Sequence, residues 1–228
     1  MKQRTFNTLF MLSSVDGKIS TGDIDARDTD KDYPKISGIK EGVQQYYDLE
    51  KRTDRVSLNT GKVMAKIGMN TGKCKLNCPN VEFVIIDSKH LTLSGVNNLI
   101  KKTKRLYLIT TNPKHPAFKV RDKLELIYYP KKINFVDLFK KFKQKYGMNR
   151  VTIQSGGTLN ATLLRAGLID RVSFVIVPTL IGGANTPSLV DGSNLRSTND
   201  LSKIKTLKLV KCEKLKKSYL HLVYSVDN

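Results

Sequence analysis

The chain has 228 residues, of which 39% are hydrophobic and 26% charged, so it is long enough for a single domain with a sizeable core. The net charge of +20 leaves three interpretations open: a nucleic-acid binder, a site for polyanionic small molecules, or a lysine-rich surface. No apolar run approaches the length that crosses a bilayer, and the first residues lack the apolar core of a secretion signal, so we expect a cytoplasmic protein without a membrane partner.

The distribution of basic residues favours the lysine-rich surface. Lysine far outnumbers arginine, is spread along the chain, and accompanies no recognised nucleic-acid-binding motif, so we expect no nucleic-acid partner. Attraction of phosphorylated ligands is then a by-product of the charge. Three cysteines, Cys74, Cys78 and Cys212, cannot form a disulfide framework, which agrees with a reducing compartment. The three histidines are scattered along the chain, so we expect no metal site.

The predicted elements alternate between strands and helices. Apolar, β-branched runs predict strands at residues 4–13, 53–59, 81–87, 105–111, 124–129, 151–153 and 170–177. Helical spacing predicts helices at 39–52, 60–68, 94–101 and 134–146, and a further helix after residue 156 that Gly167 stops. We expect a surface loop, a linker and an irregular stretch at 21–35, 68–80 and 186–200, and a final antiparallel hairpin from 207–215 and 218–226. This pattern predicts an α/β fold with a mostly parallel central sheet and helices on both faces.

Two glycines, Gly156 and Gly157, stand where the strand at 151–153 meets the following helix. Glycine lets the backbone come close to a ligand, and the first free amides of a helix, with the positive end of its dipole, favour a phosphate. A glycine pair is more often an ordinary tight turn, so these two residues alone leave both interpretations open. A second apolar strand and a second glycine loop, Pro178-Thr-Leu-Ile-Gly-Gly183, follow in the same block and favour the phosphate site.

This block and an earlier loop resemble the reductase domain of the riboflavin-biosynthesis deaminase/reductases, which have a dihydrofolate-reductase-like fold. The matching segments are Ser14-Val-Asp-Gly-Lys18, Gly156-Gly157, Ala166-Gly-Leu-Ile-Asp170 and Pro178-Thr-Leu-Ile-Gly-Gly183. The resemblance covers nearly the whole chain, so we expect one domain over residues 1–228. It implies an NADPH-dependent reductase that reduces the ribosylamino group of a pyrimidine ribosyl 5′-phosphate to a ribitylamino group. It also implies a homodimer, for which the alternating apolar residues of the final hairpin offer a face.

The resemblance implies where NADPH binds. Ser14 lies in the loop that touches the nicotinamide end, and a turn of altered residue order takes the place of the family's turn for the adenosine end: Asn59, Thr60, Gly61 and Lys62. Ligands bind outside the carboxyl ends of strands, so Lys62, Ser88 and Lys89 are expected on the 2′-phosphate, with a solvated loop at 88–89 as the alternative. The pyrophosphate is expected on the amides of Ser155, Gly156, Gly157, Thr158, Leu159 and Asn160.

Three residues are expected on the substrate side. Asp16 lies at the mouth of the site and is the candidate for the catalytic proton donor, Arg27 in the acid-rich loop is the candidate for the ribose phosphate, and Gln154 precedes the glycine turn. The family often carries Glu in place of Gln154 and Lys in place of Phe10. These departures keep an alternative open, an orphan reductase of the same fold that acts on another carbonyl, imine or pterin-like compound. A third hypothesis is an anion or nucleic-acid binder without catalysis.

Overall fold

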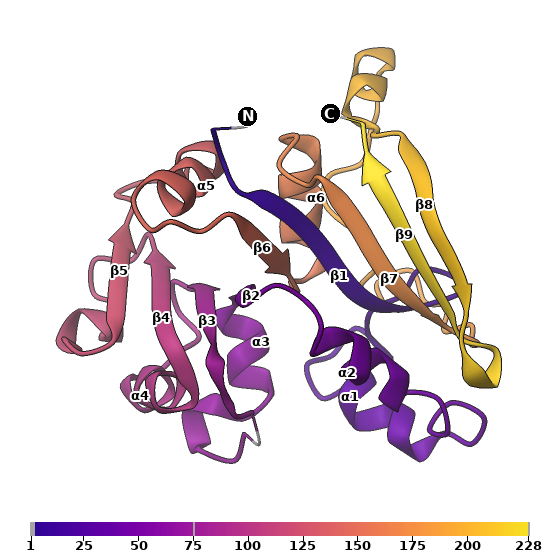
Figure 1. Ribbon diagram of the computed structural model, residues 1–228, viewed down its shortest axis with the longest axis horizontal. Coiled ribbons are helices and arrows are strands. Elements are labelled where there is room, and N and C mark those ends of the chain that lie inside the picture. Colours follow the sequence, from indigo (N-terminus) through magenta and orange to yellow (C-terminus); the bar gives the residue numbers. More distant parts are fainter. Residues whose placement is uncertain (1–2, 75, 228) are drawn as a thin grey trace. The chain divides into compact units, whose positions relative to one another are not determined.

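The computed structural model describes residues 3–74 and 76–227, and in it the chain divides into two compact units (Figure 1). Unit 1 consists of the residues up to Phe6 together with Asp54–Ser155, and unit 2 consists of Asn7–Thr53 together with the residues from Gly156 onward. Each unit contains strands covered by helices. The expectation of one domain over residues 1–228 stays a prediction.

Within its described residues, unit 1 contains five parallel strands. Their order is β5 (Leu124–Tyr128), β4 (Thr103–Thr110), β3 (Cys78–Ile86), β2 (Val56–Thr60) and β6 (Arg150–Ile153). The helices of this unit are α3 (Gly61–Lys66), α4 (Leu93–Lys102) and α5 (Phe135–Gln144), with two 3₁₀ turns, η2 (Met69–Thr71) and η3 (Pro116–Lys119). The strands and helices predicted between residues 53 and 153 are therefore confirmed, with ends that differ by a few residues.

Helices cover both faces of the strands of unit 1. Side chains of α3 and α4 pack in one apolar cluster with Phe83 and Ile85 of β3 and with alternate residues of β4. Tyr107 lies between those residues of β4 in sequence and so points to the opposite face, because side chains alternate along a strand. Its ring contacts Phe142 of α5 at 6.5 Å between centroids. The predicted placement of helices on both faces is thus confirmed within this unit.

Unit 2 carries the C-terminal hairpin. β1 (Phe6–Ser14) is parallel to β7 (Arg171–Val177), β9 (Leu220–Val226) is antiparallel to β7, and β8 (Leu207–Lys214) is antiparallel to β9. Figure 1 shows the last three strands side by side. The helical segments are α1 (Thr29–Asp32), η1 (Tyr33–Lys35), α2 (Gln44–Glu50), α6 (Gly157–Arg165), η4 (Thr198–Lys203) and η5 (Lys216–Ser218). The predicted antiparallel hairpin is confirmed.

Three segments of the chain differ from the prediction. The expected loop at 21–35 contains α1 and η1, because Asp28 caps α1 by accepting from the amide of Asp30 and Tyr33 is buried in an apolar cluster with β1 and β7. The helix expected at 39–52 begins only at Gln44. The expected linker at 68–80 contains the start of β3 at Cys78, and its residue 75 lies outside the described residues.

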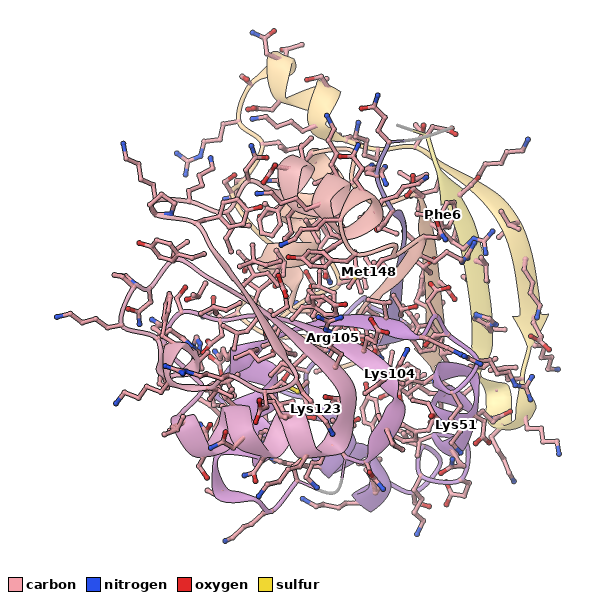
Figure 2. The ribbon with its side chains drawn as sticks, turned by 60° about the vertical axis from the view of Figure 1, so that its left-hand side comes forward. Phe6, Lys51, Lys104, Arg105, Lys123 and Met148 are labelled. Atoms are coloured by element: carbon pink, nitrogen blue, oxygen red, sulfur yellow. The ribbon has the colours of Figure 1, made fainter. Side chains whose placement is uncertain are left out.

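The basic residues are distributed as a charged surface. Figure 2 shows amine-bearing side chains projecting outward from many elements. Lys104 pairs with Glu82 at 2.8 Å, and the Arg105 guanidinium lies 5.4 Å from the centre of the Tyr107 ring. Such exposed pairs contribute little to stability, so they are solvated surface rather than a constructed site. No helix among the described residues is both long enough and apolar enough to cross a membrane.

Candidate functional site

In unit 2, the loop after β1 is tied to the second glycine loop by one carboxylate. Asp16 accepts from the Ser14 hydroxyl at 2.5 Å, from the Ile181 amide at 3.1 Å and from the Gly182 amide at 2.6 Å. The Ser14 hydroxyl, followed by these amides, lowers the pKa of Asp16 to about 2. The Ser-x-Asp-Gly-Lys segment and the Pro-x-x-x-Gly-Gly segment, which the sequence places far apart, are therefore in direct contact.

These contacts bear on the predicted role of Asp16. A carboxyl group with a pKa near 2 is ionised at neutral pH, and an ionised carboxylate only accepts hydrogen bonds. In the structure Asp16 holds the loop at residues 181–182, and its action as a proton donor stays a prediction. The Ser14 hydroxyl also stabilises the loop itself, since its oxygen accepts from the Lys18 amide at 2.8 Å.

The two glycines before α6 have different surroundings. Gly156 has an ordinary extended backbone (φ −73°, ψ 158°), and a Cβ added there would meet no atom within 4 Å. A Cβ on Gly157 would overlap the Asp191 carboxylate and the Ser188 carbonyl. Gly157 is therefore required for close packing of the loop at 188–191 against the helix, whereas Gly156 leaves open space at the helix start. The sequence did not distinguish these two functions.

The start of α6 provides fewer amides than the sequence predicts. The amides of Leu159 and Asn160 donate to the Gly156 carbonyl at 3.0 and 3.1 Å, and the Asn160 side chain donates to the Leu189 carbonyl at 2.9 Å. By contrast, the amides of Gly157 and Thr158 donate to no acceptor among the described residues. No side chain caps this helix. The Gly156 amide likewise donates to no acceptor in the described part of the chain, so three of the six predicted amides and the positive end of the helix dipole are available to a phosphate, and the phosphate site stays a prediction.

In unit 1, the predicted turn for the adenosine end begins α3. Thr60 caps this helix, with its hydroxyl accepting from the Val63 amide at 3.4 Å, and Gly61 is the first helical residue. Asn59 is buried and its side chain donates to the Ser57 hydroxyl at 3.0 Å, and its predicted contact with the cofactor stays a prediction. Lys62 follows on the first turn of the helix. The short helix predicted here is confirmed, and its cofactor contacts stay predictions.

The second predicted phosphate turn follows β3. Ser88 and Thr111 share a hydrogen bond between hydroxyls at 3.0 Å, and Lys89 is exposed without an ion pair to any residue that the structure describes. The buried Asp87, which directly precedes this turn, was not identified from the sequence. Its carboxylate is hydrogen-bonded to His115 Nε2 at 2.9 Å. An acidic residue at the end of a long apolar strand was the signal that could have identified it.

The predicted substrate residues lie in different surroundings. Arg27 is largely exposed and lies 3.9 Å from Asp32, whose pKa the Thr21 hydroxyl lowers to about 2. Gln154, in unit 1, accepts from the Ser57 hydroxyl at 3.1 Å. Both substrate assignments stay predictions.

Phe10 occupies a core position in unit 2. Its ring stacks on Tyr46 of α2 at 5.1 Å between centroids and 9° between planes, and it is 2% exposed. The position at which the resembled family often carries Lys is therefore an apolar contact here. Among the described residues, no group of three or more His, Cys, Asp or Glu could hold a metal ion.

Comparisons with known proteins agree with this architecture. Residues 5–221 match the RibD C-terminal domain. A protein named 2,5-diamino-6-ribosylamino-4(3H)-pyrimidinone 5′-phosphate reductase, from Methanothermobacter thermautotrophicus, is 25% identical over 202 residues, which cover 86% of this chain and 88% of the relative.

Solved structures show the same fold. Acinetobacter baumannii RibD has a TM-score of 0.69 at 15% identity over 100% of this chain, which spans 59% of that RibD. The Saccharomyces cerevisiae riboflavin biosynthesis reductase Rib7 has a TM-score of 0.65 at 17% identity, over 100% of this chain and 92% of Rib7. Dihydrofolate reductase from Enterococcus faecalis, complexed with NADP(H) and RAB-propyl, has a TM-score of 0.50 at 10% identity, over 98% of this chain and 97% of that one. The expected dihydrofolate-reductase-like α/β fold is confirmed, and because the family match extends over residues 5–221, the chain belongs to the RibD C-terminal domain family.

Proposed function

We propose that the chain is an NADPH-dependent reductase that converts the ribosylamino group of a pyrimidine ribosyl 5′-phosphate into a ribitylamino group. The observation that carries the proposal is the family match over residues 5–221, supported by the relative that is named as a reductase of such a phosphate. A bound NADPH would supply the hydride for the sugar carbon. The protein's own contribution is to hold and orient the two molecules.

The described residues fit such a cofactor in two places. The amides of Gly157 and Thr158, which have no acceptor in the part of the chain that the structure describes, would bind the pyrophosphate at the start of α6. Lys62, Ser88 and Lys89 would bind the phosphate on the adenosine ribose, because a hydroxyl and two ammonium groups can make charge-assisted hydrogen bonds to it. Thr60 and Gly61 would border the adenosine at the start of α3.

The substrate assignments belong to the same proposal. Arg27 would contact the ribose phosphate of the substrate, and Gln154 would donate or accept hydrogen bonds without carrying charge. Asp16 would shape the entrance to the site by holding the loop at residues 181–182. Asp16 would act in catalysis by accepting a hydrogen bond from a water molecule that delivers the proton to the substrate, because its carboxylate is ionised at neutral pH.

A direct assay tests the function. The purified chain is incubated with NADPH and the pyrimidine ribosyl 5′-phosphate, and both the loss of NADPH absorbance and the mass of the product are followed. We expect a product heavier by two hydrogens, and no turnover when the sugar phosphate is omitted. Oxidation of NADPH only with other carbonyl or imine compounds would overturn the proposed substrate while preserving the proposed reductase.

One observation favours a second candidate function. Phe10 and Tyr46 stack on each other in the core of unit 2, so no cation is present where the resembled family often carries Lys. Gln154 likewise carries no charge. A reductase of the same family that acts on a less anionic carbonyl, imine or pterin-like compound fits this pair of residues. The assay above, extended to a panel of such compounds, decides between the two.

We also propose a homodimer through the face of the unit 2 strands opposite to the apolar cluster that contains Phe10, Tyr33 and Tyr46. Met11, Phe174 and Leu222 are neighbours across β1, β7 and β9, and Phe174 stacks on Tyr224 at 6.1 Å between centroids. Leu209 lies opposite Tyr224 on β8 and is 53% exposed. This row of apolar side chains crosses four strands and is covered only in part by described residues, so a second copy of the same row is a fitting occupant.

Light scattering in moderate salt tests the dimer. We expect twice the 25.7 kDa of one chain for the wild type and for Leu201→Asp, a control at an exposed leucine outside the row. Leu209→Asp should give the mass of one chain. A single-chain mass for the wild type would refute the dimer. We keep the cytoplasm as the proposed compartment, and the three cysteines, Cys74, Cys78 and Cys212, which are too few for a disulfide framework, agree with a reducing environment.

A further inference from the structure

The turn at residues 88–91, which contains two of the proposed 2′-phosphate ligands, is built around a buried carboxylate. Asp87 accepts from the amides of Lys89, His90 and Leu91 at 3.3, 3.0 and 2.9 Å, and from the His90 ring at 3.0 Å. Burial alone would raise the pKa of Asp87, but hydrogen bonds from His115, Leu91 and His90 outweigh it and hold that pKa well below its usual range. An ionised carboxylate therefore fixes the path of the whole turn.

A buried histidine holds this carboxylate from the other side. The His115 side chain is fully buried, and its Nδ1 accepts from the Ala117 amide at 3.1 Å. The ring proton therefore lies on Nε2, which donates to the second carboxylate oxygen of Asp87 at 2.9 Å. The orientation of Asp87 is thus determined by a residue that the proposed function leaves unused.

The segment before His115 fixes Ser88 directly. The Asn112 side chain donates to the Ser88 carbonyl at 2.8 Å, and the Thr111 amide donates to the Ser88 hydroxyl at 3.3 Å. The Ser88 hydroxyl consequently has a defined direction before any ligand arrives. The residues from Thr111 to His115 form one support that holds both the start of the turn and the carboxylate beneath it.

The same carboxylate also limits the start of α3. A Cβ added to Gly61 would overlap the Asp87 side chain, so the first residue of the helix packs directly on it. Lys62 is the next residue along the helix. All three proposed 2′-phosphate ligands, Lys62, Ser88 and Lys89, therefore lie on segments that contact Asp87.

We infer that Asp87, oriented by His115, is a positioning residue that presents Lys62, Ser88 and Lys89 to the 2′-phosphate and so sets the preference for NADPH over NADH. This inference rests on the proposed NADPH function. Positioning residues of this kind lower the cost of binding because the contact groups need no reordering when the ligand arrives. Asp87 itself touches no part of the cofactor in this assignment.

The test is the ratio of the affinities for NADPH and NADH, measured by titration on the full chain. Asp87→Asn keeps the size of the side chain but replaces one acceptor oxygen with a donor, so it cannot accept from both His115 and the turn amides. We expect its NADPH affinity to fall about tenfold, with NADH affinity changed less than about twofold. Asn112→Ala, at a half-buried position, removes the hydrogen bond to the Ser88 carbonyl together with the one that the Asn112 side chain accepts from the Lys114 amide, and should lower the same ratio by about threefold.

Asp170→Asn is the matched control. Asp170 is also buried and accepts a backbone amide, that of Asn7 at 2.8 Å, but it lies just before β7 in unit 2. Asp170→Asn should reduce the melting temperature without changing the ratio of NADPH to NADH affinity. The inference is overturned, and the proposed function left intact, if the ratio of NADPH to NADH affinity is unchanged in Asn112→Ala and in any folded Asp87→Asn. It is also overturned if Asp170→Asn lowers this ratio equally. A wild-type chain that binds both cofactors equally overturns the proposed cofactor and the inference together.

Discussion

The two proposed phosphate sites differ in how they are built. At the start of α6 the site is backbone, with amides that have no acceptor among residues 3–74 and 76–227 and open space beside Gly156. After β3 the site is made of side chains on a turn, and Asp87 and His115 hold that turn from below. The first arrangement suits any phosphate, because amides and a helix dipole recognise charge alone. Under the proposed function, only the second site would distinguish NADPH from NADH, so affinity and selectivity would depend on different regions.

The largest effect is expected from a variant that blocks the first site, at the start of α6. Gly156→Val places a branched side chain in space that is open in the structure, where the pyrophosphate is proposed to lie. We expect NADPH and NADH binding to be lost together, with the free energy of unfolding lowered by only about 0.5 to 1 kcal/mol, because the new Cβ overlaps no protein atom but valine is a poorer N-cap residue than glycine. Titration of both cofactors and chemical denaturation measure the two quantities.

Gly157→Ala is the contrasting variant for that experiment. Its Cβ overlaps Asp191 and Ser188, so the loop at 188–191 must shift. Overpacking of this kind typically costs about 1 to 3 kcal/mol of stability. Retained NADPH affinity in Gly156→Val, or equal stability of the two variants, would contradict the division of functions between the two glycines.

The second site should respond only to the third phosphate of the cofactor. Removing both ammonium groups with Lys62→Ala and Lys89→Ala should weaken NADPH binding by about 1.5 to 3 kcal/mol for each lost charge-assisted contact, and leave NADH binding nearly unchanged. Competition titrations at fixed ionic strength measure the difference. A double variant that keeps the full preference for NADPH would remove the turn after β3 from the proposed site.

Acid should loosen the second site in a predictable direction. The pKa of Asp87 is lower in the folded chain than its unfolded value of about 4, so its contribution to stability is complete above that value and is lost as pH falls toward the folded pKa. Asp87→Asn should therefore be less stable than the wild type at neutral pH and lose less stability on acidification. Urea denaturation at neutral pH and below pH 4 gives the free energy of unfolding of both proteins at each pH. An equal loss of stability in the two proteins on acidification would refute the assigned role of the Asp87 carboxylate.

The smallest effect is expected at the cap of α3. The Thr60 hydroxyl accepts from the Val63 amide at 3.4 Å, a long hydrogen bond. Loss of such a cap in Thr60→Ala should cost about 0.5 to 1 kcal/mol of stability. Thermal unfolding measures it, with Thr60→Ser as the control that keeps the hydroxyl. A larger loss of NADPH affinity than of stability would mean that Thr60 also contacts the cofactor.

The sequence predicted most strands and helices because their apolar periodicities are long and are bounded by glycine and proline. It missed α1 and η1, since a single buried tyrosine, Tyr33, within an acid-rich segment leaves no periodic pattern. It identified the glycine pair before α6 but could not tell that Gly157 serves packing, because its neighbour Asp191 lies thirty-four positions later. Asp87 and His115 were missed for the same reason, as their contact joins residues 28 positions apart.

The division into two units has a consequence for the order of events during synthesis. Most of unit 1 is one continuous stretch, Asp54–Ser155, whereas unit 2 brings together residues from both ends of the chain. Asn7 and Asp170, which hydrogen-bond in unit 2, are separated by 163 positions, so β1 must wait for β7 to leave the ribosome. Contacts between distant positions form slowly, and exposed strands are prone to aggregation while they wait. We therefore expect nascent chains to acquire protease resistance first over residues 54–155, and the N-terminal strand to remain cleavable until the C-terminal hairpin has emerged.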